Sequence, residues 1–403
     1  MADVLSSGPE PGGPSHPRRR WTTPLAGALV AAAAVYLAVH AGGGMAEDPR
    51  AAGPTPSAPA PTGATPTGPA PTPATYRLHG DPGLGPTGVR ILVGGRRPAV
   101  LDAGTGRLAP LPIRLGPVDV AELDHAGGTT TVVLHNPYRL RSRAVAVGRS
   151  GKAVALGQAL DALPLRDGSV LTQDCSDPGG TGPCTLTGYA ATGAVLWRRP
   201  EPRPLDLVRD TPYGLLVRTY DTPRGGVVQL EDPRSGATYR VIGRAAGILG
   251  ADDRQVVFAP ASCATECDLV LADLDTGSSR FLPENPGSPT VAAFSRDGRR
   301  VAIGYAGMLP DDRSADPQRD GHVVVIDQHR SDFWQSVPEV TTGPASTALP
   351  VWSPDGRLLL AVPTDGSGSG RVVAWQPGAP RVTVLPVGLT GFYGIPGLAA
   401  PLS

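Results

Sequence analysis

Charge of either sign is scarce and balanced in this sequence. Of its 403 residues only 18% are charged, and 36 Lys and Arg residues are matched by 36 Asp and Glu residues. A chain with no net charge has no overall basic field that would draw it to the phosphate backbone of nucleic acid. We therefore expect no nucleic-acid partner.

The sequence also has few long stretches free of the residues that disfavour helices. The chain contains 53 Gly and 46 Pro residues. Glycine is entropically costly inside a helix, and proline removes a backbone donor there. The composition therefore favours short strands, many turns and a disordered segment, and it disfavours a helix bundle.

The common motifs of catalytic and metal sites are missing as well. The seven histidines show no H-E-x-x-H spacing, which places two ligands and a base on one helix face. Residues 148–152 end in Gly-Lys as a phosphate loop does, but Ala153 stands where the loop needs Ser or Thr for Mg²⁺. Residues 366–370 place Gly where a nucleophile elbow needs its Ser. We predict no catalysis, no cofactor and no metal.

Near the N-terminus, residues 24–41 carry no charged side chain. A helix of about 18 residues spans roughly 27 Å, close to the thickness of a hydrocarbon core. Arg18, Arg19 and Arg20 precede the run, and only Arg50 follows it closely. By the positive-inside rule this asymmetry keeps the N-terminus in the cytoplasm.

We accordingly predict a disordered cytoplasmic tail at residues 1–20 and a transmembrane helix at 21–44, with the rest of the chain outside the cytoplasm. The alternative is a signal peptide cleaved after a small residue such as Ala41 or Ala46, which would give a secreted protein.

Residues 45–75 form a linker rich in Pro, Thr and Ala. Proline interrupts both helices and sheet ladders, so we predict a disordered, semi-rigid spacer. Its threonines are potential O-glycan acceptors, although a plain low-complexity linker has the same composition.

The remaining region, residues 76–403, contains a degenerate repeat. Short apolar runs alternate with small polar turns, and corresponding turns recur at intervals of about 42 to 54 residues, near the period of propeller blades. The turns lie at residues 102–106, 148–151, 190–193, 232–236, 273–277, 327–330 and 376–378. Seven units of about 45 residues account for the whole region, so we expect no second domain.

The clearest units contain Ser-x-Asp-Gly-Arg followed by an apolar strand, at residues 295–299 and 353–357. This pattern resembles the blade signature of TolB-like and WD-repeat-like β-propellers. The resemblance implies an all-β fold, a β-propeller of about seven four-stranded blades. The WD dipeptide is absent, which argues against a WD-repeat protein in the strict sense. Residues 189–197 are similar to a unit of quinoprotein-like propellers but lack its Asp, so that family is the minority alternative.

The first unit shows only three apolar runs, between residues 90 and 113, while the chain ends in an apolar stretch without a partner. Closing the ring removes an exposed sheet edge. We predict that residues 391–401 pair with strands formed by residues 76–112.

In four-stranded blades of this kind, the connection between the second and third strands varies most along the chain, and these connections share one face of the propeller. Loops on a rigid scaffold often carry function, although surface loops also vary because they tolerate insertions. We predict this face as the binding surface. Its candidate residues are Asp221, Arg224, Asp311, Asp312, Arg313, Asp316, Arg319 and Asp365.

All four cysteines fall in two of these connections. In an oxidising compartment we expect two local disulfides, Cys175 to Cys184 and Cys263 to Cys267. A four-cysteine zinc site is the alternative, but its usual signature is two Cys-x₂-Cys pairs, which the chain lacks.

These features favour a monomeric, membrane-anchored propeller outside the cytoplasm. We expect it to contact the lipid bilayer through one helix and to bind an envelope protein or glycan without catalysis. The alternative is a propeller-scaffold enzyme, such as a quinoprotein-like dehydrogenase or a lactonase, with acidic residues in the central channel. A cluster of Asp, Glu or His at the axis favours the enzyme, and small or apolar residues there favour the binding module.

Overall fold

Every regular element that the structure describes is a β-strand. The computed structural model describes residues 90–402 except for 96, 117–118, 137–138, 178–181, 221–224, 262–267, 283–287, 307–320, 331–333, 343–346, 364–369 and 390–397. Within this part of the chain no helix is long and apolar enough to cross a membrane. The predicted tail, transmembrane helix and linker lie outside the described residues.

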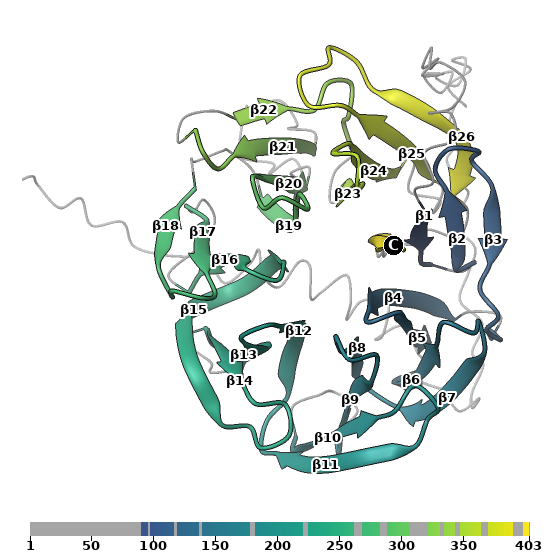
Figure 1. Ribbon diagram of the computed structural model, residues 1–403, viewed down its shortest axis with the longest axis vertical. Coiled ribbons are helices and arrows are strands. Elements are labelled where there is room, and N and C mark those ends of the chain that lie inside the picture. The colour runs from purple at the N-terminus through teal and green to yellow at the C-terminus, as the bar shows by residue number, and fades with distance from the viewer. Residues whose placement is uncertain are drawn as a thin grey trace, which may run out of the picture. The chain divides into compact units, whose positions relative to one another are not determined.

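The strands form antiparallel sheets that follow one another along the chain (Figure 1). The first sheet contains β1 (Arg90–Val93), β2 (Ala99–Asp102), β3 (Leu108–Pro110) and the last strand, β27 (Leu398–Leu402). The second contains β4 (Val120–Ala126), β5 (Thr129–Asn136), β6 (Arg139–Val147) and β7 (Ala153–Gln158). The third contains β8 (Asp161–Pro164), β9 (Val170–Cys175), β10 (Cys184–Tyr189) and β11 (Val195–Glu201).

A larger sheet of seven strands comes next. It contains β12 (Leu205–Thr211), β13 (Gly214–Thr219), β14 (Gly226–Glu231), β15 (Thr238–Ala251), β16 (Gln255–Pro260), β17 (Val270–Asp273) and β18 (Ser279–Phe281). The last two sheets contain β19 (Ser288–Phe294), β20 (Arg300–Ala306), β21 (His322–Asp327) and β22 (Trp334–Ser336), then β23 (Leu349–Trp352), β24 (Leu358–Pro363), β25 (Gly370–Trp375) and β26 (Thr383–Leu389). In the larger sheet the first part of β15 pairs with β14 and its second part pairs with β16, so one strand joins two successive four-strand sets.

The sheets surround a common centre, and in the first sheet the innermost strand is β27, the last strand of the chain (Figure 1). Neighbouring inner strands contact one another in the ring order β27, β4, β8, β12, β15, β19 and β23. All seven polar turns recognised in the sequence join the third and fourth strands of a set, at the same place in each repeat. The predicted period is therefore the period of the sheets.

The ring closes through the C-terminal strand, as predicted. β27 pairs antiparallel with β1, with Val93 opposite Leu398 and Leu92 opposite Ala399. Side chains also seal this junction, because Ile91 and Leu101 of the first sheet share a buried cluster with Leu359 of the last. Closure combines a backbone ladder with apolar burial.

Arginines on outer strands fasten successive sets together. Arg199 on β11 forms a buried ion pair with Glu231 on β14. Arg240 on β15 donates to the carbonyl of Leu274 over 2.9 Å, in the turn after β17. Each guanidinium thus bonds to a group in the following set, which fixes the sets relative to one another.

The Ser-x-Asp-Gly-Arg signature has a local explanation. Residues 295–299 and 353–357 form the turns between first and second strands of their sheets. The Ser295 hydroxyl donates to Asp297 over 2.6 Å, and Gly298 has a φ of 66°, which glycine adopts without a steric penalty. The motif is therefore a turn that sets the spacing of two strands.

Candidate functional site

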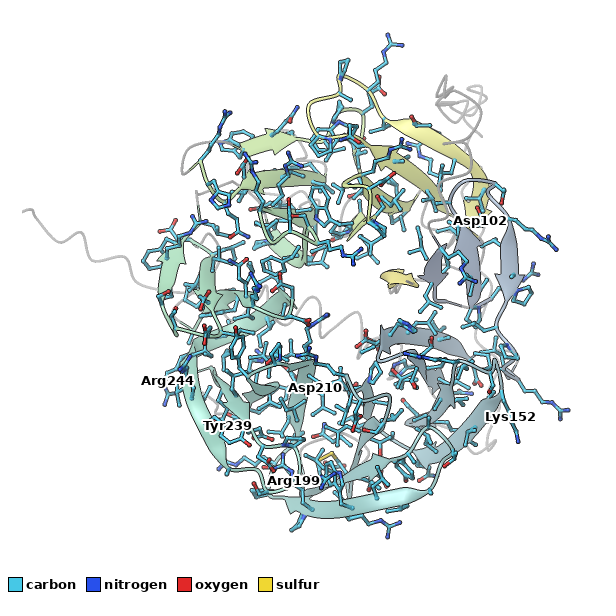
Figure 2. The ribbon with its side chains drawn as sticks, viewed as in Figure 1. Asp102, Lys152, Arg199, Asp210, Tyr239 and Arg244 are labelled. Carbon is cyan, nitrogen blue, oxygen red and sulfur yellow. A yellow bond between two sulfur atoms is a disulfide. The ribbon has the colours of Figure 1, made fainter. Side chains whose placement is uncertain are left out.

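Carboxylates line the inner strands of three successive sets. β4 carries Glu122 and Asp124, β8 carries Asp161, and β12 carries Asp206 and Asp210. Side chains alternate between the two faces of a strand, so the buried residues next to these carboxylates pack in the core while the carboxylates face the other way. Figure 2 shows Asp210 on the axial side of its sheet, whereas Tyr239 and Arg244 lie at the rim.

Two adjoining cavities, each of about 210 Å³, lie among these strands. They share Asp124 and Leu163 in their walls. The polar lining of the first cavity is Asp124, His125, Arg166, Arg209, Asp210 and Asp253. The second is lined by Glu122, Asp124, Thr131 and Asp161 together with Leu123, Val133, Ala162, Leu163, Leu207 and Val208.

In the first cavity the acidic groups have cationic or backbone partners. The pairing of β12 with β13 is irregular between Leu207 and Arg209, and such bulges change the direction of side chains. Arg209 Nε donates to Asp253 Oδ1 over 3.1 Å. The backbone N–H of Arg166 donates to Asp210 Oδ2 over 2.8 Å. Charge at this cavity is therefore largely compensated.

The second cavity differs because it holds an acid without a cation. His135 Nε2 lies 3.0 Å from Glu122 Oε2, and Arg218 Nε donates to Asp206 Oδ2 over 2.6 Å. Asp161 accepts a hydrogen bond of 2.7 Å from the backbone N–H of Ala162. Within the described part of the chain, no ion pair reaches Asp161 and no basic side chain lines this cavity.

The surroundings of these acids change their proton affinity. Asp161 keeps part of its surface open to the cavity, yet burial by the surrounding protein, followed by the carboxylates of Glu122 and Asp206, raises its pKa to about 7. Burial also raises the pKa of Asp124, opposed by the backbone N–H of His125 and by Arg209. A carboxyl group with a pKa near neutrality exists in both protonation states at physiological pH.

This arrangement can bind a cation or exchange a proton. Among the described residues, no group of three or more His, Cys, Asp or Glu side chains is placed to hold a metal ion. By the criterion set from the sequence, acidic residues at the axis favour the alternative of a propeller-scaffold enzyme. The apolar part of the second cavity, including Leu207 and Val208, equally suits the binding of an organic group.

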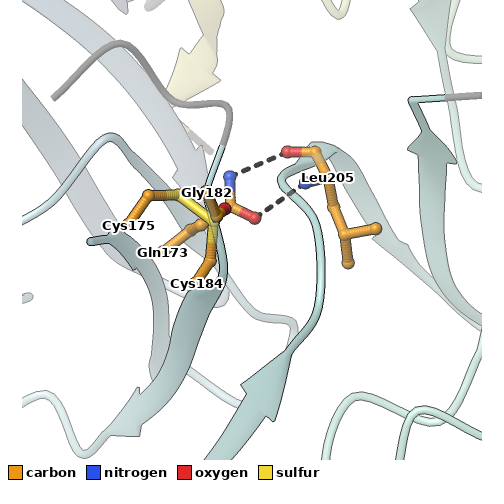
Figure 3. The surroundings of a disulfide bond; sticks show 5 residues. All are labelled: Gln173, Cys175, Gly182, Cys184 and Leu205. Atoms are coloured by element: carbon orange, nitrogen blue, oxygen red, sulfur yellow. Dashed lines mark hydrogen bonds between the residues drawn. A yellow bond between two sulfur atoms is a disulfide. The ribbon is translucent and has the colours of Figure 1, made fainter. Parts of the chain in front are cut away.

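The sequence-predicted site residues are described only in part. Cys175 and Cys184 form a disulfide, as predicted, and occupy directly paired positions of β9 and β10 (Figure 3). Cys263 and Cys267 lie outside the described residues, as do all eight loop candidates, Asp221, Arg224, Asp311, Asp312, Arg313, Asp316, Arg319 and Asp365. Their connections do join second and third strands, which was the predicted place.

Sequence reasoning missed the axial acids. A signal exists in residues 121–125, where Glu122 and Asp124 alternate with apolar residues on a short strand. Charged residues at alternate positions of an inner strand share one face, and inner strands of a propeller meet at the axis. That convergence becomes visible only when the order of strands within each unit is known.

No family model matches the chain, and no curated protein does. Among solved structures, TolB from Acinetobacter baumannii is 16% identical with a TM-score of 0.42, over 60% of this chain and 62% of that one, so the chain spans less than two thirds of its length. The β-propeller domain of the Trilobed protease from Pyrococcus furiosus is 12% identical with a TM-score of 0.44, over 66% and 84%. Prolyl oligopeptidase B from Galerina marginata is 10% identical with a TM-score of 0.50, over 77% and 50%. By the arrangement of its described strands this chain is a β-propeller, and TolB is among the solved structures that it resembles.

Proposed function

We propose that the protein is a ligand-binding β-propeller whose ligand enters the axial cavities between β4, β8 and β12. The observation that carries this proposal is the second cavity, where three carboxylates and a smaller apolar part meet at the junction of three sheets. Ligand sites are typically concave, mostly apolar and supplied with a few polar groups that fix orientation. The closed ring supplies a rigid frame for such a site.

The proposal includes seven blades and a position outside the cytoplasm. Seven blades follow if β15 is counted as the outer strand of one blade and the inner strand of the next.

The Cys175–Cys184 disulfide supports an oxidising compartment. The uncharged run at residues 24–41 and the three arginines before it support an N-terminal membrane anchor with a proline-rich stalk. Fractionation of cells and N-terminal sequencing test this topology, and a soluble protein that starts near residue 42 or 47 would contradict it.

Photo-crosslinking in intact cells tests ligand binding at the axis. The photoreactive residue benzoylphenylalanine replaces Val208, which lies partly buried on the wall of the second cavity. The matched control carries it at Phe281, which is 66% exposed on the outer strand β18. We expect a discrete adduct from position 208 that position 281 does not give. Absence of any adduct specific to position 208 would contradict an axial ligand.

The second candidate is the propeller-scaffold enzyme. Asp161 favours it, because a carboxyl group with a pKa near 7 can accept or donate a proton at neutral pH. Hydrolysis of lactone substrates by the purified chain, lost in Asp161→Asn, would support this function. Equal turnover by the variant would assign the activity to other residues or to a contaminant.

A further inference from the structure

The second cavity combines carboxylates with apolar residues, and of Glu122 and Asp161 only Glu122 has a side-chain partner, His135 at 3.0 Å. Val208, which is only partly buried, contributes apolar surface, whereas Leu123, Val133 and Leu207 are almost fully buried where they border the cavity. Glu122 and Asp161 contribute carboxylates. A buried carboxylate is costly unless a cation or hydrogen bonds compensate it, so such a cavity favours a guest that supplies positive charge.

In the first cavity, a side chain of the protein itself supplies positive charge to the acids. Arg209 lines it, and the guanidinium is bonded to Asp253 over 3.1 Å. The same guanidinium lowers the pKa of Asp124, although burial raises that pKa more strongly. The protein itself thus places one cationic group on an aliphatic stem against the acids of the axis, while the adjoining cavity receives none from the described residues.

We propose that the second cavity binds an organic cation, an ammonium or guanidinium group carried on an apolar stem, with Asp161 as its counter-ion. This inference rests on the proposed function, because it names the ligand class for the same axial site. Glu122 adds a second carboxylate at the cavity wall, and Val208 contacts the stem. The cation comes either from a free amine or from a Lys or Arg side chain of a peptide, and both sources present the same chemistry.

The size of the cavity fits this class. A volume of about 210 Å³ holds one basic side chain or a small amine and excludes a folded domain. A charge-assisted hydrogen bond to the partly buried Asp161 contributes more than a neutral hydrogen bond does. Binding to the ionised form of Asp161 displaces a proton wherever that group is protonated in the free protein.

Isothermal titration calorimetry of the full chain in detergent micelles at pH 8 tests the proposal. The probes are agmatine and cadaverine as free cations, a blocked Ala-Lys-Ala peptide, and a blocked Ala-norleucine-Ala peptide as the neutral isostere. We expect binding of at least one cationic probe, with Asp161→Asn at least tenfold weaker. Binding of the free amines alone assigns a small ligand, and binding of the lysine peptide assigns a side chain.

Two controls separate this site from general electrostatics. Asp275→Asn removes the same charge from an exposed turn, and we expect affinity within twofold of the wild type. If Asp161→Asn does not fold, Glu122→Gln, at an exposed position of β4, provides the second variant, with an expected loss of at least threefold. Equal affinity for the norleucine peptide, no loss in either axial variant, or an equal loss in Asp275→Asn would overturn the proposal.

The proposal of cation binding and the proposal of axial ligand binding can be refuted separately. Adducts from position 208 that persist unchanged in Asp161→Asn would refute cation binding, but they would still support axial ligand binding. Failure of all cationic probes in calorimetry would have the same meaning if the crosslinks form. Cation binding in calorimetry that is equal in the wild type and Asp161→Asn, without any axial crosslink in cells, would instead contradict the proposed function as well.

Discussion

Gln173 and Leu205 form a reciprocal pair of hydrogen bonds between two neighbouring sheets. Gln173 Nε2 donates to the carbonyl of Leu205 over 2.9 Å, and the backbone N–H of Leu205 donates to Gln173 Oε1 over 2.8 Å (Figure 3). Gln173 is buried, with 1% of its surface exposed. One amide thus satisfies both backbone polar groups at the start of β12, the strand that carries Asp206 and Asp210 to the axis.

Replacing Gln173 by Leu should destabilise the protein. The change preserves approximate volume but leaves the N–H and carbonyl of Leu205 without their partner, at a cost of about 1 to 3 kcal/mol for each buried group. We expect the free energy of unfolding to fall by about 2 to 5 kcal/mol in urea denaturation. Gln376→Leu, in the exposed turn after β25, is the matched control and should stay within about 0.5 kcal/mol of wild type. Equal stability of the two variants would mean that water replaces the amide.

Removal of residues 398–403 should open the ring. The deletion takes away β27 and leaves the edge of β1 unpaired, which exposes a template for strand addition. We expect a lower melting temperature and more aggregation on heating, measured by differential scanning fluorimetry with light scattering. A chain that lacks only Ser403, which follows the last strand, is the control. An unchanged melt after the longer deletion would show that the apolar junction between first and last sheets suffices.

The fold was largely predictable because its signals are local. The turns at residues 102–106 and 273–277 place small residues at fixed offsets between apolar runs, and their recurrence gives the period. The turn at 295–299 further identifies the first two strands of a set. The C-terminal partner of β1 was also predictable. The first unit has only three apolar runs, so its four-stranded sheet needs a fourth strand from elsewhere in the chain.

The axial site was not predictable in the same way. Asp161 and Glu122 lie far apart in the sequence and meet only because β4 and β8 are inner strands of neighbouring sheets. Loop length, in contrast, can be read directly from a sequence. For this reason the sequence predicted the variable connections between second and third strands as the binding surface. The inter-set contacts of Gln173 and Arg199 are equally non-local, since each bonds to a residue in the next set.

Breaking the disulfide should have a modest, local effect. Cys175 and Cys184 are separated by 9 positions, and closing a loop of about 10 residues restricts the unfolded chain by roughly 2 to 3 kcal/mol in the entropy model. We expect Cys175→Ser with Cys184→Ser to lower the free energy of unfolding by no more than this amount, with axial crosslinking unchanged. Non-reducing peptide mapping of the wild type checks the bond and also tests the predicted bridge from Cys263 to Cys267. A bridge between the two pairs would refute both assignments.

Asp161 should make the stability of the protein depend on pH. Its folded-state pKa of about 7 lies above the ordinary aspartate value of 3.8, so the folded protein retains a proton that the unfolded chain has already released. The free energy of unfolding therefore falls as pH rises from about 4 to about 7, and this loss persists above pH 7. Asp161→Asn cannot ionise, so we expect it to match the wild type near pH 4 and to melt at least a few degrees higher at pH 8.

The comparison between the two chains isolates Asp161 from the other charged groups of the axis. Those groups include Glu122 with His135 beside it, Asp206 with Arg218 and Tyr220, Asp124 with Arg209, and Asp210 with Arg166. They are present in both proteins, so their contributions to stability largely cancel in the difference of melting temperatures. Thermal melts at half-unit steps from pH 4 to pH 8 give that difference, which should grow through the window and then level off. A constant difference across the whole range would mean that Asp161 stays ionised in the folded protein, and a variant less stable at pH 8 would mean that its negative charge is already compensated.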